Sequence, residues 1–77
     1  MDILKITLKN MNKEELYDVY SDYLEAERTG NRSEKIYEIA KEIQNTEDYK
    51  NMQVYIIVDI VTNCILKEIC NRYFLKK

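Results

Sequence analysis

One helix in this sequence has its beginning, its apolar face and its end all marked by residue type. Asn12 and Glu15 form a capping-box pattern, in which each side chain accepts a hydrogen bond from the backbone of the other. Apolar residues then recur at the spacing of one helix face, at Leu16, Val19, Tyr20, Tyr23 and Leu24. Gly30, the only glycine, can adopt the left-handed conformation that ends many helices. The pattern predicts a helix over residues 12–29.

Two further helices are expected downstream. Asn31 or Ser33 can cap a helix over residues 32–44, whose apolar stripe consists of Ile36, Ile39, Ala40 and Ile43. Residues 46–75 contain no glycine or proline, so we expect one unbroken helix of roughly 43 Å at 1.5 Å per residue. The β-branched run at 54–58 leaves a strand as the alternative in this segment.

The N-terminal residues 1–10 show a different period. Apolar and polar residues alternate from Leu4 to Lys9, which predicts a short strand or extended segment. The expected fold is therefore mainly all-α: one small domain over residues 1–77, with three helices, a long C-terminal helix and a short N-terminal extended segment or strand. The alternative is an α+β fold in the order β-α-α-β-α.

Composition removes most catalytic chemistry. The chain has 77 residues and no histidine, which excludes an ordinary catalytic triad and an imidazole ligand. Two cysteines, Cys64 and Cys70, do not make a zinc site, and a single glycine excludes a phosphate-cradling loop. A chain this short buries only roughly 60% of its unfolded surface, which leaves little volume for a catalytic pocket. We expect no catalytic residue, no metal, no cofactor and no enzymatic activity.

Acidic residues are concentrated in the helix over 12–29. Residues 14–27 contain six carboxylates and no lysine or arginine. Five of the six fall within an arc of about 100° on a helical wheel, opposite the apolar face. Such a face is either simply solvated or a docking surface for a basic partner. For the second case the predicted partner-binding residues are Glu14, Glu15, Tyr17, Asp18, Asp22 and Glu25.

The C-terminal stretch combines basic charge with an apolar stripe. Residues 67–77 carry a net charge of +3. Cations are favourable at the end of a helix, so this charge does not by itself indicate a binding site. The stripe is a candidate surface for self-association, with the predicted residues Leu66, Ile69, Cys70 and Tyr73.

These features favour a non-enzymatic protein that binds another macromolecule. The expected partner is a protein with a basic, possibly nucleic-acid-binding, surface. The small size and acidic charge are in the general character of phage- or mobile-element-encoded inhibitors of host defence, of the anti-CRISPR kind, although no motif is shared. The alternatives are a homodimeric regulatory or adaptor module assembled through the C-terminal helix, and a nucleic-acid-binding regulator that uses the basic ends. We expect a cytoplasmic protein with reduced thiols, no signal sequence and no membrane contact.

Overall fold

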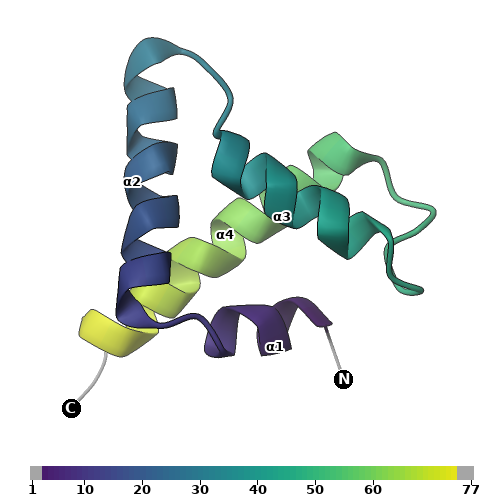
Figure 1. Ribbon diagram of the computed structural model, residues 1–77, viewed down its shortest axis with the longest axis horizontal. Helices are drawn as coiled ribbons and strands as arrows, with labels where there is room; N and C mark the ends of the chain where they lie inside the picture. The colour runs from purple at the N-terminus through teal and green to yellow at the C-terminus, as the bar shows by residue number, and fades with distance from the viewer. Residues whose placement is uncertain (1–2, 75–77) are drawn as a thin grey trace.

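The computed structural model describes residues 3–74, which form four helices (Figure 1). In chain order they are α1 (Ile3–Lys9), α2 (Lys13–Thr29), α3 (Glu34–Gln44) and α4 (Val54–Tyr73). Within this part of the chain there is no strand. The prediction of a mainly all-α fold is confirmed, and the β-α-α-β-α alternative is wrong.

Helix α4 is the element around which the others pack. Figure 1 shows α3 crossing α4, α1 lying below them, and α2 standing to one side and approaching α4 near its C-terminal end. Ile57, Val61 and Ile65 lie on one side of α4 and are at most 1% exposed. Full burial of such a side chain contributes about 1.5–3 kcal/mol relative to exposure. All four helices supply the core: Leu4, Leu8, Leu16, Val19, Ile36, Ala40, Ile43, Ile57, Val61 and Ile65.

The N-terminal segment is a helix and not the predicted strand. Leu4 and Leu8 are buried, and a spacing of four residues fits one helix face as well as alternate positions of a strand. A lone strand would leave its backbone groups unpaired, whereas a helix satisfies them internally. Arg72 of α4 also donates from Nη2 to the Leu8 carbonyl, at 3.0 Å, and so fastens the end of α1.

The predicted unbroken helix over 46–75 is wrong in its first part. Residues 45–53 form successive turns, and α4 begins only at Val54. Gln44 holds this connection by donating from Nε2 to the Met52 carbonyl at 2.9 Å. The turns let α4 run back across α3, so that the core face of α4 packs against Ile36, Ala40 and Ile43. The predicted end at Leu75 lies outside the described residues.

Helix α2 follows its sequence signals closely. Asn12 Oδ1 accepts from the Glu15 backbone at 2.8 Å, and Glu15 Oε1 accepts from the Asn12 backbone at 2.9 Å. Gly30 ends the helix with a φ of 77°. The helix predicted over residues 12–29 spans Lys13–Thr29 with Asn12 as its N-cap, and the following helix starts at Glu34, with Ser33 as its cap, in place of residue 32.

Candidate functional site

The acidic face of α2 is partly used by the fold itself. Glu15 completes the capping box at the start of α2. Glu25 pairs with Arg28 one turn later on the same helix. These two carboxylates therefore have internal partners, as does Asp22, which contacts the next helix.

Asp22 joins α2 to the N-terminus of α3. One oxygen, Oδ2, accepts a hydrogen bond from Ser33 Oγ at 2.6 Å and another from the Lys35 backbone at 3.1 Å. The Ser33 hydroxyl in turn accepts from the Ile36 backbone at 3.3 Å, so the two side chains together satisfy N–H groups of the first turn of α3. These hydrogen bonds, that from Ser33 above all, lower the pKa of Asp22 below its usual value.

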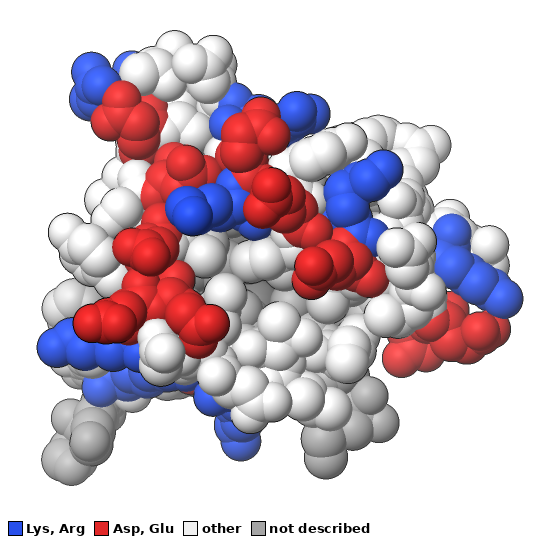
Figure 2. Space-filling model, in the orientation of Figure 1, with Lys and Arg blue, Asp and Glu red and all other residues white. Residues whose placement is uncertain are grey.

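Glu14 and Asp18 differ from the other three. Both are exposed, they lie one turn apart on α2, and within residues 3–74 neither is assigned an ion pair or a side-chain hydrogen bond. Figure 2 shows that acidic side chains on this side of the molecule gather over α2 and continue over α3, with lysine and arginine side chains between them. The unpaired part of the predicted acidic face is thus its N-terminal half.

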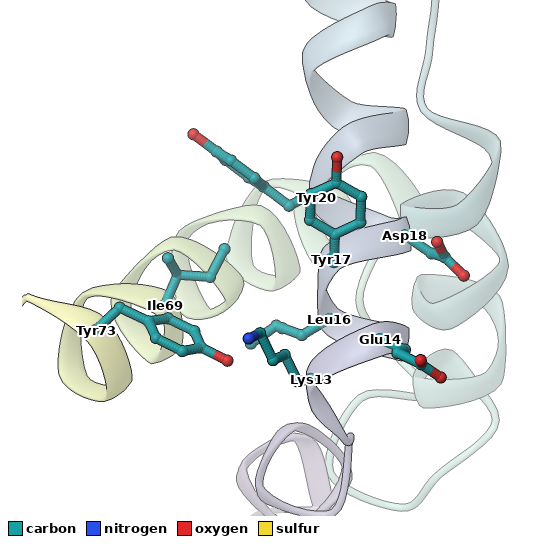
Figure 3. A pocket seen from close by; sticks show the side chains of 8 residues that line it. All are labelled: Lys13, Glu14, Leu16, Tyr17, Asp18, Tyr20, Ile69 and Tyr73. Atoms are coloured by element: carbon teal, nitrogen blue, oxygen red, sulfur yellow. The ribbon is translucent and has the colours of Figure 1, made fainter.

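An open groove separates the first half of α2 from the last turns of α4. Its volume is about 750 Å³. Leu16, Tyr17 and Tyr20 of α2 line it together with Ile69 and Tyr73 of α4, and we call this surface the tyrosine groove (Figure 3). Leu16 is buried at its floor, while Tyr17 and Tyr73 are 67% and 48% exposed.

Charged side chains flank the tyrosine groove on two sides. Lys13 points into it, toward Tyr73, whereas Glu14 and Asp18 point from the opposite side of α2 toward α3 (Figure 3). All three residues contribute to the rim. The groove and the exposed carboxylates are therefore adjacent surfaces that point in different directions.

The two predicted residue sets meet in this region only in part. Glu14, Tyr17 and Asp18 from the first set lie close to Ile69 and Tyr73 from the second. The other two members of the second set are separate, because a smaller hollow of about 250 Å³ is lined by Leu66, Lys67, Cys70 and Asn71. Sequence reasoning missed Lys13, Leu16 and Tyr20 as site residues.

Apolar surface continues from the tyrosine groove along α2. Leu24 was expected on the buried face but is 47% exposed, and Tyr20 is half-buried. Tyr17, Tyr20 and Leu24 have the spacing of one helix face, on which Tyr17 and Leu24 are exposed and Tyr20 is half-buried. The Tyr20 ring stacks beside that of Tyr23, with 6.5 Å between the ring centroids.

Other kinds of site find little support in the described residues. Among residues 3–74, no three histidine, cysteine, aspartate or glutamate side chains are grouped so that they could hold a metal ion. Cys64 is half-buried and Cys70 exposed, and both are free thiols. No helix in this range combines the length and the apolar character needed to cross a membrane.

Comparison of the chain with protein-family models, curated proteins and solved structures found no match. The geometry around α2 and α4 is therefore what bears on function.

Proposed function

We propose that this chain is a non-enzymatic protein-binding module that docks the acidic side of α2 on a basic surface of another protein. The observation that carries the proposal is the position of Glu14 and Asp18. They are exposed carboxylates, one turn apart, with no ion pair among the described residues. We call the surface formed by Glu14 and Asp18 the acidic edge.

The acidic edge costs the isolated chain some stability. Like charges four residues apart on a helix repel by a few tenths of a kcal/mol. The fold provides partners for three other carboxylates of α2: Glu15 completes the capping box, Asp22 binds the N-terminus of α3, and Glu25 pairs with Arg28. Nothing comparable offsets Glu14 and Asp18 within the described residues, so a cation from outside would relieve their repulsion.

Charge of this kind favours a protein partner over a nucleic acid. Phosphates would be repelled by the acidic edge, and the chain as a whole has a net charge of −2. Lysine and arginine on a partner would be attracted to it, most strongly at low salt. If the basic surface of the partner normally binds nucleic acid, occupation of that surface would make this chain an inhibitor.

The proposal is tested by paired charge-neutral variants. The chain is immobilised and used to capture proteins from lysate of its native host, and the affinity of the captured protein is then measured at several salt concentrations. Glu14→Gln/Asp18→Asn should weaken binding at least about tenfold and flatten the salt dependence.

The matched control removes the same two charges elsewhere. Glu27 lies on a different side of α2, and Asp48 lies in the connection between α3 and α4; both are exposed. Glu27→Gln/Asp48→Asn should bind as the native chain does. Equal weakening by the two double variants would mean that only net charge matters, and unchanged binding in the first would remove the acidic edge from the interface.

A further inference from the structure

We infer that the partner offers an amphipathic helix with lysine or arginine along one flank, and that this helix lies on an exposed apolar stripe of α2 beside the acidic edge. The stripe consists of Tyr17, Tyr20 and Leu24. The inference rests on the proposed function and deepens it, because it states which kind of segment of a basic protein is bound.

The stripe is apolar, accessible and regular in its spacing. Tyr17 and Leu24 are 67% and 47% exposed, and Tyr20 between them is half-buried. Steps of three and four residues keep these side chains on one line along about 10 Å of α2. Apolar side chains with the same spacing on a second helix form a ridge that can pack along such a line. The tyrosine groove adjoins the stripe, because Tyr17 and Tyr20 belong to both.

Backbone hydrogen bonding selects a helix over an extended segment as the occupant. The surface around the stripe is built from α2 and α4, whose backbone groups are already bonded within each helix. An extended segment laid on this surface would find no backbone partners for the N–H and C=O groups on its inner side. A helix satisfies its own backbone and presents only side chains, which is how amphipathic helices bind apolar grooves.

Charge beside the stripe determines where the cations of the partner lie. In Figure 3 Tyr17 lies between Tyr20 on one side of α2 and the acidic edge on the other. Successive residues of a helix are about 100° apart, so Asp18 flanks the stripe directly beside Tyr17. A lysine or arginine on the matching flank of the partner helix can lay its apolar stem along the Tyr17 ring and reach the acidic edge with its charged end.

Lys13 sets the opposite sign at the start of the stripe. It precedes Tyr17 by four residues, so it lies on the same line, and it points into the tyrosine groove toward Tyr73. A cation of the partner opposite Lys13 would be repelled. The bound helix should therefore carry its cations over the acidic edge and should place a carboxylate, or its own negative C-terminal end, opposite Lys13.

A displayed library of random peptides of about 16 residues, each roughly 24 Å long as a helix, tests the inference on the full chain. Peptides enriched at physiological salt should have apolar residues at helical spacing and lysine or arginine on one flank. One enriched peptide with a fluorescent label then gives dissociation constants by anisotropy. Tyr17→Ser/Leu24→Ser should raise the dissociation constant at least about tenfold. Circular dichroism checks that this variant keeps its helices.

Tyr55 and Ile56 provide the matched control. They are 63% and 40% exposed, but they lie in the first turn of α4, and residue 55 is about 21 Å along that helix from residue 69 in the groove. Tyr55→Ser/Ile56→Ser should leave the dissociation constant unchanged.

Three results would overturn the inference. The first is a library that yields no binder, or binders without helical spacing and a basic flank. The second is equal weakening by the two serine pairs. The third is a chain that sediments as a dimer and that Tyr17→Ser/Leu24→Ser converts to a monomer, because a second copy would then cover the stripe.

The outcome can be separated from that of the proposed function. If Glu14→Gln/Asp18→Asn weakens binding of a basic protein and Tyr17→Ser/Leu24→Ser does not, the acidic edge stands and the stripe is removed from the interface. If the serine pair weakens peptide binding and the charge-neutral pair changes neither the constant nor its salt dependence, the acidic edge and the proposed function are removed, and the stripe remains a site for a helix.

Discussion

Replacement of Asp22 should loosen the junction between α2 and α3. Asp22 accepts hydrogen bonds from the Ser33 hydroxyl and the Lys35 backbone, and these are side-chain contacts that fasten α3 to α2. Asp22→Ala removes both and leaves the Ser33 side chain, which is 8% exposed, without its acceptor. We therefore expect a loss of stability well above that of an ordinary surface substitution.

The magnitude follows from the two hydrogen bonds. A hydrogen bond to a charged group contributes about 1.5–3 kcal/mol when it is well shielded from water. Asp22 is only half-buried, so we expect about 2 kcal/mol for the pair of bonds. For a chain of this size that loss lowers the Tm by roughly 8–16 °C. Asp22→Asn keeps an acceptor oxygen but loses the charge, and should cost about half as much.

The pH dependence of this contribution has a definite sign. The hydrogen bonds from Ser33 and Lys35 lower the pKa of Asp22 in the folded chain. A group of this kind stabilises the fold fully above its unfolded pKa of about 3.9, and the contribution disappears as the pH falls through the lower, folded value. The difference in stability between the native chain and Asp22→Asn should therefore be constant above about pH 5 and narrow below about pH 4.

Urea denaturation followed by circular dichroism, repeated from pH 3 to pH 7, measures both effects. Asp18→Ala is the control, because Asp18 lies one turn earlier on α2 and makes no comparable contact within the described residues. It should change stability by less than about 0.5 kcal/mol. Equal free energies of unfolding for the two alanine variants would refute the assignment of Asp22 as the link between α2 and α3.

Two other contacts give simple expectations. Arg72 donates to the carbonyls of Leu8 and Lys9 and to Glu68. Arg72→Met should therefore lower the free energy of unfolding by about 1–2 kcal/mol and speed amide hydrogen exchange in α1 far more than in α3. An equal increase in exchange across the chain would contradict this. Gly30 has a φ of 77° and open space around it. Gly30→Ala should therefore lower the free energy of unfolding by about 1 kcal/mol through backbone strain alone, and Gly30→Asn should lower it less, as measured by urea midpoints. An alanine variant as stable as the asparagine variant would contradict this.

Local signals were enough to predict α2 but not the elements on either side of it. The capping box and Gly30 act within one turn of their own positions, so the sequence alone specifies both ends of that helix. Residues 3–9 are too few to separate a period of two from one of 3.6, because Leu4 and Leu8 satisfy both. The hydrogen bond that fastens the end of α1 comes from Arg72, more than 60 residues away.

The tyrosine groove could not be predicted because it depends on the break before α4. Residues 45–53 contain no glycine or proline, and their turns are closed by backbone hydrogen bonds, from Tyr49 to Thr46 and from Met52 to Tyr49, and by the side-chain bond from Gln44 to the Met52 carbonyl. Without that reversal α4 would continue away from α3, and Tyr73 could not come back to Tyr17. The sequence patterns place Tyr17 and Tyr73 on two separate predicted surfaces, whereas the structure places both at one groove.

Asp18 and Asp22 show that one charge pattern can have two structural outcomes. Both lie on the same line along α2, four residues apart, with no basic residue nearby on that helix. The N-terminus of α3 reaches only the upper end of this line, where it offers Asp22 a hydroxyl and a backbone N–H group. Nearer the start of α2, no described cation pairs with Asp18 or Glu14. In one row of carboxylates, Asp22 therefore joins α2 to α3, whereas Glu14 and Asp18 remain exposed and unpaired within the described residues.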